Sequence, residues 1–150
     1  EFSPIVFILD SNLKIDLKSK ILKRKNIFIL TTSECNKSKR DILIENGIKI
    51  KILDSDKKNI ISIKSILDFL NELKINNLLI EAGSIVNTFF LKNKLIDKII
   101  LCRSGIVLGS DAQSFFNEIN LQSIPEKAIY KLSSSFQIDD DIVEEWKINN

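Results

Sequence analysis

The chain has 150 residues, of which 44% are hydrophobic, and its 22 basic side chains nearly balance 20 acidic ones, for a formal charge of +2. This length and composition predict a globular domain that can bury a core. Its charges are scattered along the whole length, which argues against a nucleic-acid-binding protein. The absence of histidine excludes His-dependent catalytic triads and His-ligated metal sites.

The two cysteines and the start of the chain narrow the class of protein further. Cys35 and Cys102 each stand without a second cysteine nearby, so they are expected to be buried or half-buried thiols, and no metal site is predicted. Neither a membrane-spanning run nor a signal peptide is visible, so we expect no membrane partner and a cytoplasmic location. The chain enters a strand pattern at once and has no initial Met. We therefore expect residues 1–150 to form one domain of an N-terminally truncated, longer chain.

The first half of the chain alternates between strand and helix patterns. Uninterrupted apolar runs are typical of strands buried on both faces, and alternation of Ile with Lys is typical of a strand near a sheet edge. Three-four spacing of apolar residues indicates an amphipathic helix. These patterns predict strands at residues 5–9, 27–30 and 48–52, a helix at residues 36–46 ending at Gly47, and a helix at residues 63–73 capped by Ser62.

The second half continues this alternation and then ends in a pattern typical of an antiparallel hairpin. The patterns predict strands at residues 78–80 and 99–102, a helix that Gly83 and Ser84 open, and a hairpin of strands 128–136 and 142–148 around an acidic turn. The fold class expected is α/β: a three-layer α/β/α sandwich with a mixed, mostly parallel sheet and a C-terminal antiparallel hairpin. We expect the aromatic pairs at 89–90 and 115–116, and Trp146, to pack in the core.

The segment after residue 80 is the most pointed candidate for a ligand site. Ligands of open α/β sheets gather beyond the carboxyl ends of strands. Here an expected strand runs into Glu81 and then into Gly83 and Ser84. Gly83 lets the backbone approach a ligand, and the helix start presents N–H donors that favour phosphate. Glu81 is then expected to face the ligand as an acceptor, although the same pattern also makes a tight turn without a ligand.

Two further strand ends carry short hydrogen-bonding side chains. Residues 10–12 (Asp, Ser, Asn) follow the first strand, and residues 31–33 (Thr, Thr, Ser) follow the second. These residue types are also common turn formers, so each segment alone favours a structural role. Convergence of three strand ends on one sheet edge favours a site. A fourth segment, residues 105–111, is bracketed by glycines and is expected to be a turn.

Five motifs in order along nearly the whole chain resemble the reductase domain of the bifunctional riboflavin-biosynthesis deaminase/reductase. They are LDSNLKI at residues 9–15, TT at 31–32, EAGS at 81–84, LIDKI at 95–99 and LGSDA at 108–112. The resemblance implies a dihydrofolate-reductase-like fold. It also implies reduction of the ribosyl side chain of 5-amino-6-(5-phosphoribosylamino)uracil to ribityl, with NADPH as the hydride donor and a homodimer as the assembly.

The resemblance also implies roles for individual residues, although it assigns no catalytic residue. Glu81 matches the substrate-binding acid of the family. The residues matching its cofactor contacts are Ser11, Gly83, Ser84, Ile85, Val86, Asn87, Thr88 and Phe89. A basic residue normally contacts the 2′-phosphate that distinguishes NADPH from NADH. The candidates are Lys37, Lys39 and Arg40 in this chain, or a residue of the family's N-terminal segment that this sequence lacks.

Departures from the family leave two other functions open. The sequence has no counterpart of the family's first strand, its Lys-containing motif or its Asp and Arg substrate contacts. It also lacks the zinc-binding deaminase half. A deaminase domain, where the parent chain has one, is expected upstream of these residues. One alternative is an enzyme closer to dihydrofolate reductase, although a Trp-containing early segment and a folate-binding acid cannot be located. The other is a non-catalytic α/β domain that binds a nucleotide or phosphate.

Overall fold

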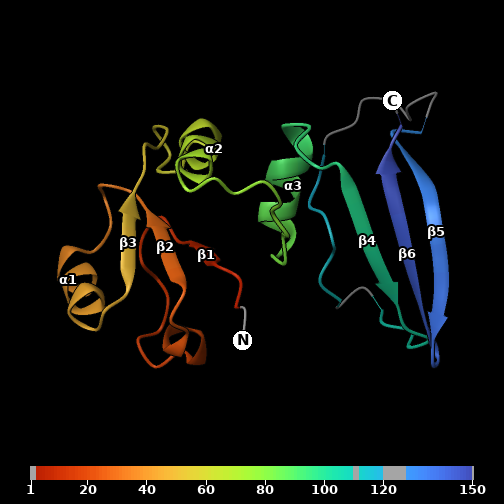
Figure 1. Ribbon diagram of the computed structural model, residues 1–150, viewed down its shortest axis with the longest axis horizontal. Helices are drawn as coiled ribbons and strands as arrows, with labels where there is room; N and C mark the ends of the chain where they lie inside the picture. The colour runs from red at the N-terminus through yellow and green to blue at the C-terminus, as the bar shows by residue number, and fades with distance from the viewer. Residues whose placement is uncertain (1–2, 110–111, 120–127, 150) are drawn as a thin grey trace. The chain divides into compact units, whose positions relative to one another are not determined.

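The computed structural model describes residues 3–109, 112–119 and 128–149. The chain divides into two compact units, Glu1–Leu78 and Leu79–Asn150, and each is described by itself (Figure 1). The first unit holds a parallel sheet with two helices and a short 3-10 helix. The second holds one helix and an antiparallel sheet.

The sheet of the first unit consists of three parallel strands in the order β1-β2-β3. These strands are β1 (Val6–Leu9), β2 (Ile27–Thr31) and β3 (Lys49–Ile52). The central strand β2 is the most deeply buried, whereas β1 is half-buried and β3 has two half-buried residues between two exposed ones. Three strand predictions are therefore confirmed, including the edge position of the Ile-Lys strand.

The two α-helices of the first unit begin and end close to where the sequence indicates, whereas its short 3-10 helix has no counterpart among the sequence predictions. These helices are the 3-10 helix η1 (Lys20–Lys23), α1 (Lys37–Glu45) and α2 (Ile63–Glu72). The Asn36 side chain caps α1 by accepting a hydrogen bond from the Lys39 N–H at 2.9 Å. Gly47, with φ of +78°, follows α1 in the left-handed conformation that glycine adopts without a steric cost. Ser62 occupies the predicted N-cap position of α2, but its side chain makes no hydrogen bond that caps the helix.

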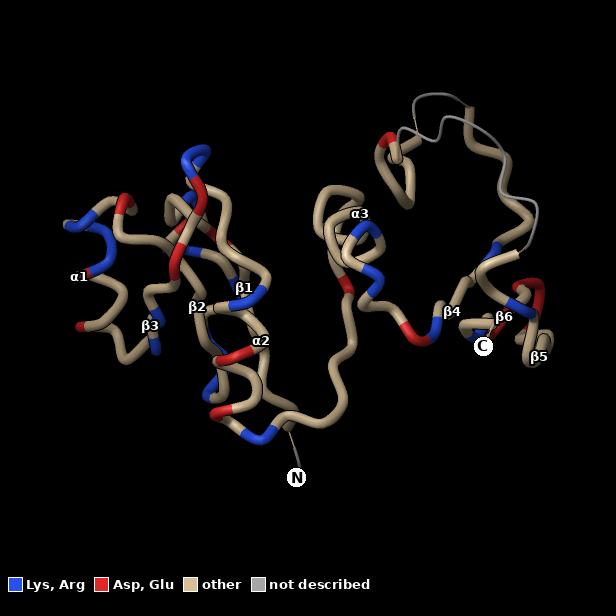
Figure 2. Tube along the Cα trace, turned by 90° about the horizontal axis from the view of Figure 1, so that it is seen from above, with Lys and Arg blue, Asp and Glu red and all other residues tan. Residues whose placement is uncertain are grey.

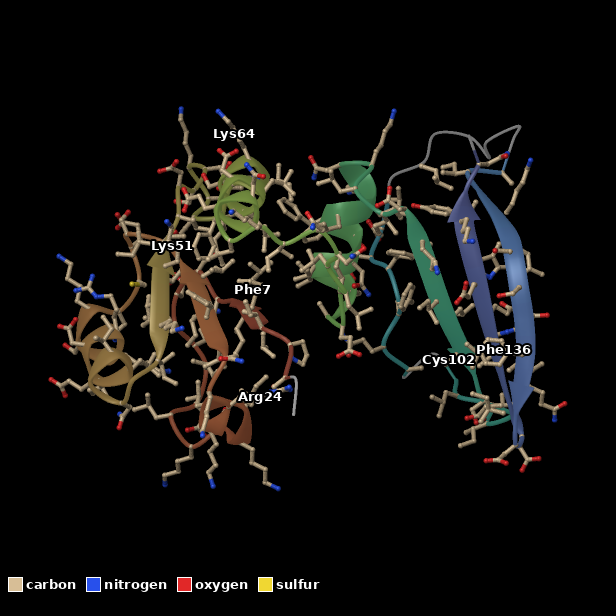
Figure 3. The ribbon with its side chains drawn as sticks, in the orientation of Figure 1. Phe7, Arg24, Lys51, Lys64, Cys102 and Phe136 are labelled. Carbon is tan, nitrogen blue, oxygen red and sulfur yellow. The ribbon has the colours of Figure 1, made fainter. Side chains whose placement is uncertain are left out.

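Each face of this sheet carries its own apolar cluster. Leu43 of α1 packs with Ile27 and Ile29 of β2 in the main core. On the other face, rings of Phe7, Phe28 and Phe69 lie with centroids 5.6 to 6.3 Å apart, and Phe69 belongs to α2 (Figure 3). Because successive strand residues point to opposite faces, the first unit is a three-layer α/β/α arrangement.

Two lysines of β3 cover the edge of the aromatic face. The Nζ atom of Lys49 lies 5.1 Å from the Phe28 ring centroid, and that of Lys51 lies 4.6 Å from the Phe69 centroid. Lys51 also pairs with Glu72 at 3.2 Å. Lys49 and Lys51 therefore stabilise the fold, because their aliphatic stems cover the aromatic rings while their charged groups stay near water.

The second unit contains α3 (Ser84–Lys92), followed by β4 (Lys98–Arg103), β5 (Tyr130–Ile138) and β6 (Asp141–Ile148). These strands form an antiparallel sheet in the order β4-β6-β5 (Figure 1). The predicted terminal hairpin is confirmed, with Asp139 at a positive φ of 50° in its turn. Parallel and antiparallel pairing both occur as expected, but in two three-stranded sheets of the described residues.

The strand predicted at residues 78–80 is wrong. This segment is irregular, and Leu78 and Leu79 are 42% and 72% exposed. A buried strand depends on neighbouring strands that pair its N–H and C=O groups, and the apolar run alone does not supply them. Pairing with neighbouring strands in the folded protein, and not the local sequence pattern, therefore determines whether this segment forms a strand.

The predicted core positions are only partly confirmed. Phe90 is 4% exposed, and Trp146 is half-buried and donates a hydrogen bond to Glu144. Phe115, in contrast, is 48% exposed and stacks edge-to-face on Phe116, so its core assignment is wrong. Cys35 is buried as expected, but Cys102 is exposed on β4, an edge strand of its sheet (Figure 3). Among the residues that the structure describes, no helix is long and apolar enough to cross a membrane.

Leu43 and Ile44 provide a matched test of the core of the first unit. They are neighbours on α1, but Leu43 is 1% exposed and Ile44 is 52% exposed. We expect Leu43→Ala to lower the free energy of unfolding by about 2 to 5 kcal/mol because it leaves a cavity. Ile44→Ala is expected to change it by about 0.5 kcal/mol or less. Urea denaturation measures both, and equal losses would contradict the packing described.

Candidate functional site

The carboxyl ends of β1 and β2 meet through a pair of hydrogen bonds. The Oγ1 atoms of Thr31 and Thr32 both donate to the backbone oxygen of Ser11, at 3.0 and 3.1 Å. Both threonines are fully buried, whereas Ser11 is half-buried. The two predicted segments are therefore brought together, with the threonines fixing the main chain at Ser11.

The residues on either side of Ser11 stabilise the same loop. An Asp10 carboxylate oxygen accepts the Ile15 N–H at 2.8 Å, which is the turn-forming role that sequence reasoning left open. The Asn12 Oδ1 atom accepts a hydrogen bond from Asn59 at 2.8 Å. Sequence reasoning missed Asn59, whose positive φ of 58° is a conformation that asparagine tolerates well.

Basic residues gather near the start of α1. Figure 2 shows this cluster in blue, and its members are Lys37, Lys39 and Arg40. The Arg40 guanidinium pairs with Asp41 at 3.0 Å, which offsets part of its charge. Lys37 is exposed and Lys39 half-buried, so both remain candidates for contact with an anionic group.

The start of α3 leaves backbone donors available. Gly83 occupies the N-cap position and has no side chain to cap the helix, and the first intrahelical bond runs from the Asn87 N–H to the Gly83 oxygen at 3.1 Å. The preceding N–H groups of the first turn therefore have no intrahelical acceptor. Together with the partial positive charge of the helix end, they fit a phosphate group.

Two buried polar residues of α3, Asn87 and Thr88, are already hydrogen-bonded. The Asn87 Nδ2 atom donates to the Phe115 oxygen at 3.1 Å, and the Thr88 Oγ1 atom accepts the Asn117 N–H at 2.8 Å. Each of these side chains is only 6% exposed. The structure thus places two of the expected cofactor contacts against a neighbouring stretch of the protein.

The other expected ligand residues of the second unit differ in exposure. Glu81 is exposed in the irregular segment before α3. Ser84 is buried and Ile85 is 74% exposed, while Val86 and Phe89 are half-buried. Ser11 belongs to the first compact unit, whereas Glu81 and the residues of α3 belong to the second.

The glycine-bracketed segment after β4 has no packed core of its own. Ile106, Val107 and Leu108 are 74%, 94% and 71% exposed. Ser110 and Asp111, which belong to the same predicted turn, lie outside the described residues. The structure therefore supplies no ligand-binding geometry for this candidate.

Titratable groups supply few additional candidates. Burial, with a smaller contribution from Asp97, raises the pKa of the Tyr130 phenol, whose hydroxyl donates to the Ile96 oxygen at 2.9 Å. A phenol that stays protonated and donates to the backbone serves the fold of the second unit. Within the described ranges, no three His, Cys, Asp or Glu residues come together as a metal site would require.

Comparison with known proteins identifies the class to which this fold belongs. The model for the RibD C-terminal domain family matches residues 1–143. The structure of RibD from Acinetobacter baumannii (form 2) superimposes with a TM-score of 0.78 at 25% identity, covering 95% of this chain and 37% of that one. The structural match shows that this chain shares the α/β fold of a RibD protein. The chain belongs to the RibD C-terminal domain family, which confirms the resemblance seen in the five motifs.

Two curated relatives agree with this assignment. The chain is 34% identical over 139 residues to the 5-amino-6-(5-phosphoribosylamino)uracil reductase of Buchnera aphidicola subsp. Acyrthosiphon pisum, covering 93% of this chain. It is 26% identical over 143 residues to the riboflavin biosynthesis protein RibD of Aquifex aeolicus, covering 95% of this chain. The chain spans 65% and 38% of the length of these two relatives.

Proposed function

We propose that this chain carries out the NADPH-dependent reduction of 5-amino-6-(5-phosphoribosylamino)uracil to its ribitylamino product in riboflavin biosynthesis. The observation that carries the proposal is the family match over residues 1–143. The 34% identity to a protein named as that reductase supports the choice of substrate. The open N-terminus of α3, which fits a phosphate group, supports a phosphate-bearing cofactor.

In this proposal the chain binds and orients while the cofactor supplies the chemistry. NADPH, when bound, supplies the hydride that reduces the sugar carbon. The first turn of α3 holds a cofactor phosphate through backbone N–H groups. The family resemblance assigns Ser11 as a further cofactor contact, and Thr31 and Thr32 fix the main chain of its loop. Glu81 accepts hydrogen bonds from the substrate. Orientation of the two reactants then lowers the entropic part of the barrier.

The preference for NADPH is assigned to a basic contact with its 2′-phosphate. Lys37 and Lys39 near the start of α1 are the candidates in this chain, because Arg40 is paired with Asp41. We propose a homodimer as the assembly and the cytoplasm as the location, on the basis of the family resemblance. Deaminase chemistry is not assigned to these residues.

Turnover tests the proposed activity directly. We expect the protein to oxidise NADPH only when 5-amino-6-(5-phosphoribosylamino)uracil is present, and to do so more slowly with NADH. The absorbance of the reduced nicotinamide gives the rate, and chromatography identifies the ribitylamino product. NADPH oxidation that does not depend on this substrate would contradict the proposal.

Glu81→Gln tests the role of the acid before α3. Glu81 is exposed, so the substitution is expected to leave the urea unfolding midpoint unchanged. It is expected to lower kcat/KM for the uracil substrate about tenfold or more, because a hydrogen bond to a charged acceptor is stronger than one to a neutral amide. Glu45→Gln, on the exposed end of α1, is the control. An unchanged kcat/KM would assign Glu81 a structural role.

Gly83→Val tests the placement of the cofactor phosphate. Gly83 has a φ of −72°, which valine adopts without strain, so the variant is expected to fold. Its branched side chain would cover the open N–H groups and weaken NADPH binding about tenfold. Gly105→Val is the matched control, because nothing lies within 4 Å of a Cβ built there. Calorimetry gives both dissociation constants, and equal values would contradict the placement.

A further inference from the structure

A stretch of chain after β4 is held along α3 by side chains of the helix. As described above, Asn87 donates to the oxygen of Phe115 and Thr88 accepts the N–H of Asn117. Both bonds reach the backbone of this stretch, which we call the strap and define as residues 113–117. Two bonds to alternate residues fix both the position and the direction of the strap.

Burial makes these two bonds costly to lose. Asn87 and Thr88 are each 6% exposed, so water does not readily replace a missing partner. At this exposure neither side chain is open to a ligand from solvent. These residues therefore contribute to a ligand site through the strap rather than by contact.

The strap brings a second polar group to the start of α3. A Cβ atom built on Gly83 would lie 3.3 Å from the Nε2 atom of Gln113. Gly83 and Gln113 are both exposed, so a ligand can reach them from solvent. The Gln113 amide thus stands next to the N-cap position, where the helix has no side-chain cap.

A glutamine amide at this place complements the helix end. The open N–H groups of α3 are donors, and the Gln113 NH₂ group adds a donor that can hydrogen-bond a phosphate oxygen. A neutral side chain also adds no charge that repels an anion. The side chain is long enough to turn its NH₂ group toward a ligand at Gly83.

We propose that Gln113 is a further cofactor-binding residue that donates a hydrogen bond to a phosphate of NADPH at the start of α3, and that Asn87 and Thr88 are the positioning residues that place it there. The inference rests on the proposed function, because it takes NADPH as the ligand. It gives Asn87 and Thr88 a different role from the direct contact that the family resemblance implied.

Gln113→Ala and Gln113→Glu test the contact itself. Calorimetric titration with NADPH is expected to show about tenfold weaker binding for Gln113→Ala, because the donor is lost. Gln113→Glu is expected to bind more weakly still, because its carboxylate repels the phosphate. Gln137→Ala is the matched control, since this exposed glutamine lies on β5 and donates to Asp139. It is expected to bind like the unmodified chain.

Thr88→Val and Thr88→Ser test the positioning role. Valine has the shape of threonine but no acceptor for the Asn117 N–H, whereas serine keeps the acceptor. Thr88→Val is expected to weaken NADPH binding about fivefold, with restoration by Thr88→Ser. In a Gln113→Ala background, Thr88→Val is expected to have little further effect on the dissociation constant, because the group that it positions is absent. A purely structural Thr88 would lower thermal stability without this coupling.

The outcomes separate the inference from the function on which it rests. Weaker NADPH binding by both Gln113 variants, with coupling to Thr88, supports the inference. Unchanged binding by Gln113→Ala, in a chain whose unmodified form binds NADPH, overturns the inference and leaves the proposed function in place. Independent, additive effects of the two substitutions overturn the positioning role. Failure of the unmodified chain to bind NADPH overturns the proposed cofactor and the inference together.

Discussion

Pairing of backbone N–H and C=O groups is the constraint on which both units depend. In the first unit β2 pairs with a strand on each side, and its residues Ile29 and Leu30 are fully buried. In the second unit β6 takes the corresponding central place between β4 and β5. Strands of this kind can be buried because every polar backbone group along them has a partner.

Where this backbone pairing stops, side chains or ligands must satisfy the N–H and C=O groups that remain. At the end of β2, Thr31 and the following Thr32 satisfy the Ser11 oxygen and fix its loop. At the start of α3, no side chain caps the open N–H groups. One unit thus closes its strand ends internally, while the other keeps a helix end free, and the proposed phosphate contact follows from that difference.

The sequence predicts the elements whose evidence is local. An uninterrupted apolar run identifies the buried strand β2, and three-four spacing of apolar residues identifies α2, which buries one face. Two strand patterns around an acidic turn identify the terminal hairpin. The pattern at residues 78–80 fails, since a strand also requires partners that a single segment does not encode. Among the site residues, Gly83 can be predicted from the sequence, because a glycine just before a helix has no side chain to cap the first N–H groups.

The remaining site contacts depend on residues distant along the chain. Thr31 and Thr32 read as turn formers, and only the fold shows that both donate to Ser11. Asn87 and Thr88 read as polar residues of a ligand-binding helix, yet their partners lie at positions 115 and 117. Gln113 does not belong to any of the five motifs in the sequence. Such roles arise from tertiary placement, so spacing along the sequence does not reveal them.

The central claim is that this chain carries a binding site for NADPH, and calorimetric titration of the chain with NADPH and NADH tests it most directly. The account predicts saturable binding of NADPH at micromolar strength, with NADH weaker because it lacks the 2′-phosphate. Raising the salt concentration should weaken NADPH binding, since the contact with phosphate is electrostatic. Absence of binding by either nucleotide to the folded chain would contradict the account.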